Sequence, residues 1–342
     1  MAGKSTADLH YNHTRLVLKY AVISRLVLIS LIVLWRSLLS PYDTSASINP
    51  SCLSNTTSII GLFSGSNSYL KSDSPPVLLP RLASVIEDSI VWDSVYFVRI
   101  AQCGYEYEQN YAFFPLIPIC ISLLSRTVFA PLIPFIGQRA VLGLSGYVLN
   151  NFAFVLASFY LYRLSAIILK DSEVAFRATI LFCLNPASIF YSSIYTESMY
   201  ALCSIGGLYY LMRGSNNIAT LCLALTGFAR SNGVLIAGYI CFQTMHRSYK
   251  AAFVRKNAGG TLLVLLSGAL RSLFIISPFI AFQAYGYYNM CGRGTSDEMR
   301  PWCKGSGFLK VFSSKTNSKL CSCISNIISC TLHNHTLCEA MA

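Results

Sequence analysis

Long apolar runs separated by short polar turns dominate the hydropathy pattern of this chain. Leu16–Leu39, Val141–Leu169 and Leu262–Ala284 are each long enough and apolar enough to cross a bilayer as a helix. Because runs of this length are typical of membrane spans, the pattern predicts an all-α, polytopic membrane protein.

The other apolar runs are interrupted by residues that a lipid-facing helix would not carry. Tyr111–Ile136 holds four prolines and is predicted to be re-entrant or to cross as two short halves. Ala178–Tyr191 and Ser198–Met212 flank a polar turn, and Ile218–Phe242 carries a polar segment, 230–232, at its middle. Polar groups at membrane depth are tolerated where protein or a cavity shields them, so we expect interior polar sites.

Composition supports the membrane class and excludes one alternative. The chain is 54% hydrophobic and 12% charged, and it has 26 Lys and Arg against 14 Asp and Glu. This basic excess forms no clusters on soluble sequence, so we expect no nucleic-acid partner. Seven cysteines lie singly, mostly in apolar runs, and are predicted to be buried and unpaired: Cys103, Cys120, Cys183, Cys203, Cys222, Cys241 and Cys291.

Basic residues fix the expected orientation. Lys4, Arg15 and Lys19 precede the first run, so the positive-inside rule places the N-terminus in the cytosol and the next loop in the lumen. That loop carries the glycosylation sequon Asn55-Thr56-Thr57. The predicted divisions are a cytosolic N-terminus (1–15), a first span (16–40), a lumenal loop (41–110), a helical bundle (111–284), a polar segment (285–312) and an off-pattern, disordered tail (313–342).

The lumenal loop ends in a stretch that predicts chemistry. Leu82–Gln102 is amphipathic at helical spacing and is predicted to be one helix lying in the membrane interface. Asp93 stands beside Trp92 in it, and a carboxylate next to an aromatic ring can act as a general base. The alternative is a solvated interfacial acid. Asp43, at the lumenal end of the first span, is a rival base.

Three further groups are candidate site residues. The Asn185–Ser198 turn has a helix break at Pro186 and a new helix predicted to begin at Glu197, which suits a polyhydroxylated ligand or, alternatively, an ordinary capped turn. Arg230 inside an apolar run needs an anion, which could be a phosphate, Glu197 or a lipid headgroup. Arg25 inside the first span is either functional or snorkels toward the cytosolic face.

Five separated blocks resemble the PIG-V family, in the family's order. They are the first span with Arg25, Trp92-Asp93 with Gly104-Tyr105 and Glu108, Ala112-Phe113-Phe114-Pro115, Asn185-Pro186-Ala187 with Tyr195-Thr196-Glu197-Ser198, and Arg230-Ser231-Asn232-Gly233. Members of this family add the second mannose of the glycosylphosphatidylinositol (GPI) anchor precursor.

The resemblance implies a GT-C-type glycosyltransferase bundle in the endoplasmic reticulum membrane. The implied donor is dolichyl-phosphate mannose, the implied acceptor is the GPI glycolipid precursor, and the implied new linkage is α-1,6, formed at the lumenal face. Membrane lipids and a small membrane subunit would be further partners, with no cofactor or metal. Asp93 would be the base, and the substrate would be held by Trp92, Glu108, Asn185, Tyr195, Glu197, Arg230, Asn232 and Arg25.

The last part of the chain departs from the family pattern. Family members continue with several more spans, whereas the resemblance stops after Phe312. The tail holds cysteines and histidines without zinc spacing. We therefore expect a C-terminally truncated or aberrantly spliced form that could be inactive. The alternative functions are a non-catalytic membrane subunit of the GPI pathway and a lipid or polyol transporter.

Overall fold

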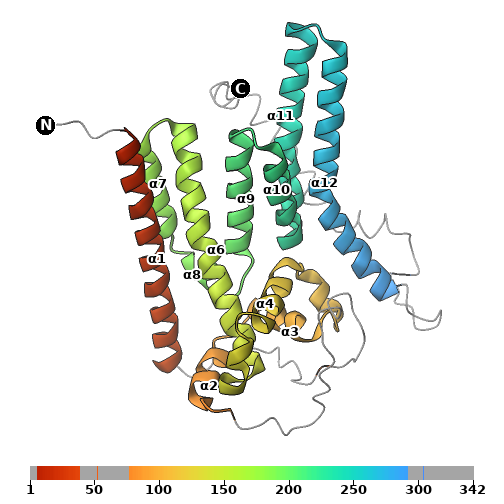
Figure 1. Ribbon diagram of the computed structural model, residues 1–342. Coiled ribbons are helices and arrows are strands. Elements are labelled where there is room, and N and C mark those ends of the chain that lie inside the picture. Colours follow the sequence, from red (N-terminus) through yellow and green to blue (C-terminus); the bar gives the residue numbers. More distant parts are fainter. Residues whose placement is uncertain (1–5, 39–51, 53–76, 292–302, 304–342) are drawn as a thin grey trace, which may run out of the picture. The chain divides into compact units, whose positions relative to one another are not determined.

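The computed structural model describes residues 6–38, 52, 77–291 and 303 of the chain (Figure 1). The chain divides into unit 1, residues 1–236, and unit 2, residues 237–342. Every regular element in these described ranges is helical, which confirms the all-α prediction. Asp43, Asn55 and the tail at 313–342 lie outside the described residues.

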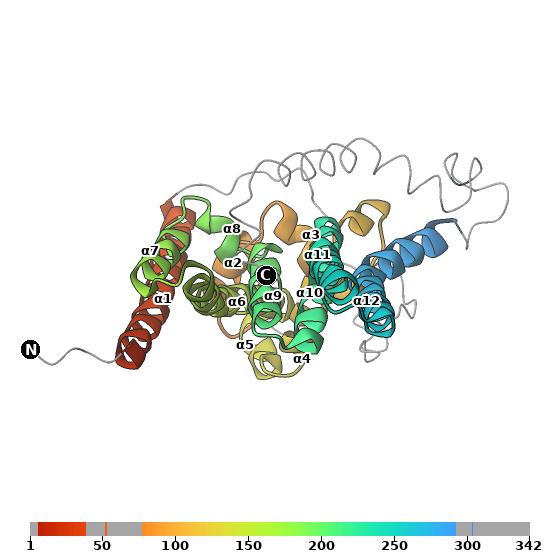
Figure 2. The same ribbon diagram turned by 90° about the horizontal axis from the view of Figure 1, so that it is seen from above.

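Two long helices form the membrane-spanning frame of unit 1. α1 (Thr6–Leu38) contains a candidate span at Tyr11–Trp35, and α6 (Gln138–Leu169) is a second one, as predicted. Seen along the helix axes, α6 lies between the pair formed by α1 and α7 (Ser172–Cys183) and the next helix, α9 (Glu197–Met212) (Figure 2). α6 therefore contacts both sides of the unit.

The prediction of one interfacial helix over 82–102 is wrong. The structure has two helices, α2 (Pro80–Asp88) and α3 (Asp93–Cys103), and the break between them includes Trp92 at a φ of 56°. A bulky residue at positive φ cannot continue a right-handed helix. α3 does not lie on a lipid surface, because its residues from Ser94 to Ala101, apart from Tyr96, are buried against α4 and α6.

The prediction that the proline-rich run at 111–136 is not a single straight span is confirmed. α4 (Leu116–Arg126) is followed by a short 3₁₀ turn, η3 (Ala130–Leu132), and by α5 (Ile133–Ile136). The two halves bend by 67° relative to each other, which is the geometry of a broken span or a re-entrant loop. An earlier 3₁₀ turn, η2 (Glu108–Ala112), connects α3 to this segment.

The predicted break around Asn185-Pro186 is present. α7 ends at Cys183, a short helix, α8 (Ser188–Ser192), follows, and α9 begins at Glu197. α10 (Asn216–Ala229) then ends directly before Arg230, and η4 (Ser231–Ile236) closes unit 1. The run at 218–242 is therefore interrupted at the polar segment that the sequence indicated.

Unit 2 contains two described helices. α11 (Ala237–Tyr249) leads through a π-helical turn, η5 (Lys250–Val254), into α12 (Ala258–Cys291), which is the third candidate span. Gly268 lets α12 approach α11 closely, because a Cβ placed there would come within 2.2 Å of Thr244.

Two of the seven cysteines predicted to be unpaired are disulfide-bonded. Cys103 pairs with Cys52, and Cys291 pairs with Cys303. The other five are free, as predicted, but burial is confirmed fully only for Cys183 and Cys203, and the prediction is wrong for Cys241, which is exposed. The prediction failed for Cys103 because this residue ends α3 outside the apolar runs, where its Cα lies 5.5 Å from that of Cys52.

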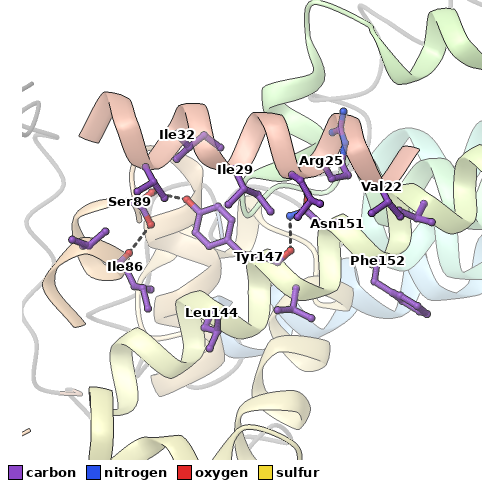
Figure 3. Close-up of a pocket in the computed structure, with 15 residues that line it drawn as sticks. Val22, Arg25, Ile29, Ile32, Ile86, Ser89, Leu144, Tyr147, Asn151 and Phe152 are labelled. Carbon is purple, nitrogen blue, oxygen red and sulfur yellow. Dashed lines mark hydrogen bonds between the residues drawn. The ribbon is translucent and has the colours of Figure 1, made fainter. Parts of the chain in front are cut away.

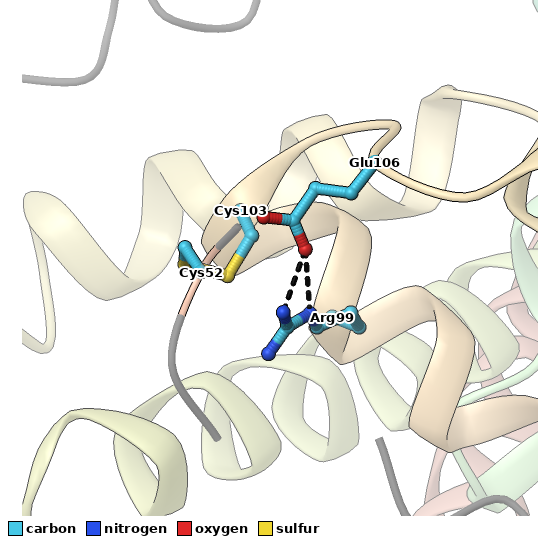
Figure 4. The surroundings of a disulfide bond; sticks show 4 residues. All are labelled: Cys52, Arg99, Cys103 and Glu106. Carbon is cyan, nitrogen blue, oxygen red and sulfur yellow. Dashed lines mark hydrogen bonds and ion pairs between the residues drawn. A yellow bond between two sulfur atoms is a disulfide. The ribbon is translucent and has the colours of Figure 1, made fainter. Parts of the chain in front are cut away.

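A buried ion pair lies beside the Cys52–Cys103 disulfide (Figure 4). Arg99 donates from Nε and Nη2 to Glu106 Oε2 at 2.9 Å and 2.6 Å, and both side chains are about 5% exposed or less. The Glu106 carboxylate therefore ties the turn after α3 back onto that helix.

Candidate active site

The site is built by three segments of unit 1 that are far apart in the sequence. Asp93 is the first residue of α3, Glu197 is the first residue of α9, and Arg230 directly follows α10. Arg230 Nη1 donates to Glu197 Oε1 at 2.5 Å, and the charges of both residues act on Asp93. The structure therefore brings together three residues that the sequence had proposed separately.

Each member of this cluster retains free bonding capacity. The Asp93 carboxylate accepts no hydrogen bond from the described residues, and Glu197 Oε2 is buried without a partner among them. Arg230 uses Nη1 for the ion pair, and its side chain is 39% exposed. An incoming polar ligand can therefore bond to a carboxylate, a second carboxylate and a guanidinium in one place.

The pKa of the Asp93 carboxyl is raised above its ordinary value. Partial burial is the main cause, and the negative charge of Glu197 adds to it, while the positive charge of Arg230 acts in the opposite direction. A carboxylate whose pKa is raised is a stronger proton acceptor in its ionised form. Asp93 itself is exposed, so what favours the general-base interpretation is its raised pKa together with its place beside Glu197 and Arg230.

Tyr195 lies beside Asp93 and stays protonated. Burial raises the pKa of Tyr195 to about 12, and the Asp93 charge adds to the rise, while a backbone hydrogen bond with Asp93 lowers it. At neutral pH this phenol is therefore a hydrogen-bond donor and not a base.

The turn that carries Tyr195 and leads to Glu197 is held by two neighbouring asparagines of α6. Asn150 Nδ2 donates to the carbonyls of Ser193 and Tyr195, the latter at 2.9 Å. Asn151 Nδ2 donates to the Ser192 carbonyl at 3.2 Å. Since buried backbone carbonyls need partners, these amides fix the path of the turn.

Two further contacts fasten the same turn. Ser94 Oγ, next to Asp93, donates to the Ile194 carbonyl at 3.2 Å and so joins α3 to the turn directly. The fully buried Ile194 side chain packs onto Gly146 of α6, where a Cβ would meet its Cγ1 at 2.9 Å. The absence of a side chain at Gly146 thus allows the turn to seat against α6.

A close backbone approach presents Arg230. A Cβ at Gly233 would lie 2.2 Å from the Thr226 carbonyl oxygen, so only glycine fits there. Thr226 Oγ1 donates to the carbonyls of Leu223 and Gly233, at 2.6 Å and 3.2 Å. The polar 230–233 segment therefore has a structural reason for its glycine as well as a cation to display.

Arg25 is turned into the protein and is only 2% exposed. Its guanidinium donates to the Ser188 carbonyl at 3.1 Å, the Ser188 hydroxyl at 2.9 Å and the Ser192 hydroxyl at 3.0 Å. It also stacks 3.7 Å from the centre of the Phe154 ring. The side chain therefore does not snorkel, and its contacts fasten α1 to α8.

Among the other predicted substrate-binding residues, Trp92, Asn185 and Asn232 form no hydrogen bond or ion pair with the cluster in the described part of the chain. Trp92 is 59% exposed at the helix break, and Asn232 is exposed after Arg230. Asn185 Oδ1 accepts from the Ala187 amide at 2.8 Å, which is a local turn. Glu108 begins η2 and is exposed.

Sequence reasoning missed the residues that hold the site in place. Asn150, Asn151 and Gly146 lie within the apolar run at 141–169, which had been assigned only as a span. Two adjacent asparagines inside a membrane helix were a signal, because buried amides at membrane depth need polar partners.

The fold and the cluster together define an all-α, polytopic membrane protein with a carboxylate–arginine site at the ends of its helices. The family described as Mannosyltransferase (PIG-V) matches residues 14–326, and the chain belongs to this family.

Individual relatives carry matching names. The chain is 31% identical over 229 residues to GPI alpha-1,6-mannosyltransferase 2 of Rattus norvegicus, covering 65% of this chain and 46% of that protein. The protein of the same name from Cricetulus griseus is 30% identical over 281 residues, covering 82% of this chain and 52% of the relative. For the Homo sapiens protein the identity is 31% over 238 residues, with 67% and 47% covered.

The chain spans about half the length of these curated relatives. No solved structure matches it.

Proposed function

We propose that this chain carries the catalytic end of a membrane mannosyltransferase that adds a mannose in an α-1,6 linkage to a GPI glycolipid precursor. The observation that carries the proposal is the convergence of Asp93, Glu197 and Arg230 from three separate segments. Relatives named GPI alpha-1,6-mannosyltransferase 2 support the acceptor and the linkage. We further propose dolichyl-phosphate mannose as the donor, at the lumenal face of the endoplasmic reticulum.

The proposed reaction needs one base and one cationic group. Asp93 takes the proton of the acceptor hydroxyl. The oxygen of that hydroxyl forms a bond to C1 of the mannose, and the bond from C1 to the phosphate oxygen breaks. Dolichyl phosphate leaves with the electron pair of that bond. Arg230 stabilises the charge that develops on the phosphate, so the step needs no metal.

Glu197 and Tyr195 have complementary roles in this scheme. The buried, unpartnered Oε2 of Glu197 accepts a hydrogen bond from a sugar hydroxyl, and the protonated Tyr195 donates one. Holding the acceptor in one orientation supplies a large part of the rate enhancement in transfer reactions.

The test of this function uses cells that lack the second mannosyltransferase of GPI synthesis. This chain, expressed in them, should convert the accumulated one-mannose intermediate and restore GPI-anchored protein at the surface. Asp93→Asn should lower conversion by ~10²–10⁴-fold, with unchanged protein in the membrane. Asp43→Asn is the matched control, and loss with Asp43→Asn alone would move the base to Asp43.

Two other outcomes separate the alternatives. If the chain is present in the membrane but never converts the intermediate, the transfer function proposed for it is wrong. If it then restores activity only to a co-expressed, weakened enzyme, it acts as a non-catalytic subunit.

A further inference from the structure

An apolar pocket of about 440 Å³ lies between α1, α2 and α6. Figure 3 shows side chains of α1 and α6 facing each other across it, with α2 at one end. Its walls include Val22, Ile29 and Ile32 of α1 and Leu144, Val148 and Val155 of α6. Val22 and Ile32 are ten residues apart, so the pocket extends ~15 Å along α1.

The polar residues in these walls direct their polar atoms elsewhere. The Tyr147 hydroxyl donates to the Ser89 carbonyl at 3.1 Å, and Asn151 Nδ2 donates to the carbonyls of Tyr147 and Ser192. The Arg25 guanidinium bonds to Ser188 and Ser192, so only the rest of its side chain is left for the wall. The pocket therefore presents almost entirely carbon.

The position of the pocket determines what can enter it. α1 and α6 are both candidate spans, so the pocket opens at membrane depth. Its rim residues Leu26 and Phe152 are 59% and 64% exposed, with no described residue covering them. In a bilayer the medium at this depth is hydrocarbon and not water, which favours a lipid chain as the occupant.

The size of the pocket selects a single chain. A helix with its side chains is about 10–12 Å across, so a cavity of this volume would hold only about one turn of a helix. A glycerolipid brings two adjacent acyl chains to one headgroup. A polyprenyl lipid brings one, which suits a single pocket that runs along one pair of helices.

The pocket ends next to the segments that carry the site. Ser89, at the α2 end, precedes Asp93 by four residues. Asn151, in the wall, holds the Ser192 carbonyl, and its neighbour Asn150 holds the turn before Glu197. A chain that leaves the pocket at the α2 end would bring its headgroup to the segment that leads from Ser89 to Asp93.

We propose that this pocket between α1, α2 and α6 binds the polyprenyl chain of the phosphate-linked sugar donor. The inference rests on the proposed function, because it assumes a lipid-linked donor. It assigns the donor chain, and not the acyl chains of the acceptor, to this surface.

The test is photocrosslinking of the full chain in phosphatidylcholine vesicles. The probe is a polyprenyl phosphate without sugar that carries a diazirine in its third isoprene unit. We expect crosslinked peptides from α1 and α6, and we expect excess unlabelled polyprenyl phosphate, but not phosphatidylinositol, to abolish them. Crosslinks confined to other helices, or equal competition by phosphatidylinositol, would overturn the proposal.

A pocket-filling variant gives a second measurement. Val148→Trp places a large ring in the pocket and should lower crosslinking about tenfold. Leu181→Trp, on the exposed side of α7 at 74% exposure and outside the pocket, is the matched control and should keep it. Unchanged crosslinking in a folded Val148→Trp protein would contradict the proposal. If that variant does not fold, the positions of the crosslinked peptides in the unaltered chain test the proposal alone.

The design separates this inference from the proposed function. The probe has no sugar, so crosslinking does not depend on transfer. If the probe crosslinks in the pocket but the chain transfers no mannose in cells, the transferase function is wrong and the lipid site is supported. If Val148→Trp does not affect transfer from a long-chain donor, the pocket is not the donor site, and the transferase function is supported.

Discussion

At the scale of single residues, the site depends on how three charges balance one another. Asp93, Glu197 and Arg230 leave a net charge of −1 when all three are ionised, so one carboxylate lacks a fixed counter-charge. Arg230 pairs with Glu197, while the pKa of Asp93 is raised mainly by partial removal from water and further by the charge of Glu197. A raised pKa makes Asp93 suitable as a base.

Glu197→Gln should move the pH dependence of transfer in a defined direction. A base acts only when ionised, so activity falls as the pH falls through the pKa of Asp93. Partial burial and Glu197 raise this pKa, so the fall begins at a higher pH than for an ordinary aspartate. Removing the negative charge of Glu197 lowers the pKa again, and the acid limb of kcat/KM should shift to lower pH.

Arg230→Gln is the opposite change in the same measurement. It removes the positive charge that lowers the pKa of Asp93, so the acid limb should shift to higher pH. The comparison uses the pH at which kcat/KM falls on the acid side and not the maximal value of kcat/KM, because both variants also alter substrate contacts. Shifts of the same sign in both variants would show that Asp93 is not the titrating group.

Arg25→Lys should destabilise the protein although it keeps the charge. A single ammonium cannot reach the carbonyl and the two hydroxyls that the guanidinium bonds, and it loses part of the stacking on Phe154. Buried groups left without a partner cost ~1–3 kcal/mol each. The measurement is the thermal midpoint in detergent.

The matched control for Arg25 is Arg177→Lys. Arg177 forms an exposed pair with Glu173 four residues earlier on α7, and such pairs contribute ~0.3–0.5 kcal/mol at most. Equal midpoints for the two variants would contradict the anchoring role of Arg25.

At the scale of helices, the site is placed by how its turn seats against α6. Gly146, Asn150 and Asn151 lie on α6, and each meets the 192–195 turn by a different contact. α6 supports the turn in two ways: Gly146 leaves room for the Ile194 side chain, and the two asparagine amides donate to carbonyls of the turn. The catalytic candidates themselves stand at helix starts and ends.

Gly146→Ala should displace this turn. The added Cβ would meet Ile194 Cγ1 at 2.9 Å and two other Ile194 carbons at 3.0 Å, and excess volume in a packed core typically costs ~1–3 kcal/mol. Ile194→Val, which removes a methyl group, should restore part of the lost stability in the double variant. Thermal unfolding of the four proteins gives the coupling.

Gly238→Ala is the internal reference for that experiment. Gly238 lies in α11 with nothing within 4 Å of its would-be Cβ, so alanine should stabilise the helix by ~0.5–1 kcal/mol. If Gly146→Ala behaved like Gly238→Ala, the packing of Ile194 against α6 would not position the turn.

At the scale of the whole chain, hydropathy predicted the spans and their breaks but not the partners. The length and composition of an apolar run are enough to predict whether it spans a membrane. The spans at α1, α6 and α12 and the break at Arg230 could therefore be predicted from each run alone. The choice of Glu197 for Arg230 is a long-range outcome, and the sequence left a phosphate and a lipid headgroup equally open. The Cys52–Cys103 disulfide, with a sequence separation of 51, was missed for the same reason. The Arg99–Glu106 pair is local, and it was missed because Glu106 shows no sign of burial in the hydropathy pattern.

Loss of the Cys52–Cys103 disulfide should weaken the attachment of the first loop. The bond closes a loop over a sequence separation of 51, for which loop-closure entropy predicts ~4 kcal/mol of stabilisation. Cys52→Ser should therefore lower the thermal midpoint, while Cys241→Ser, at a free cysteine, should change it little. A midpoint of the unaltered chain that does not respond to reductant would contradict this role.

The orientation of the chain ties the disulfide to the glycosylation sequon. Disulfides persist in oxidising compartments, so a bond at Cys52 agrees with the prediction that the segment after α1 is lumenal and that Asn55 can be glycosylated. In microsomes, the chain should lose an endoglycosidase-sensitive mass when Asn55 is changed to Gln. The sequon Asn12-His13-Thr14, at the other end of α1, should stay unmodified because the positive-inside rule predicts a cytosolic N-terminus. A mass shift that depends on Asn12 instead would invert the topology and would place Asp93 and its cluster on the cytosolic side.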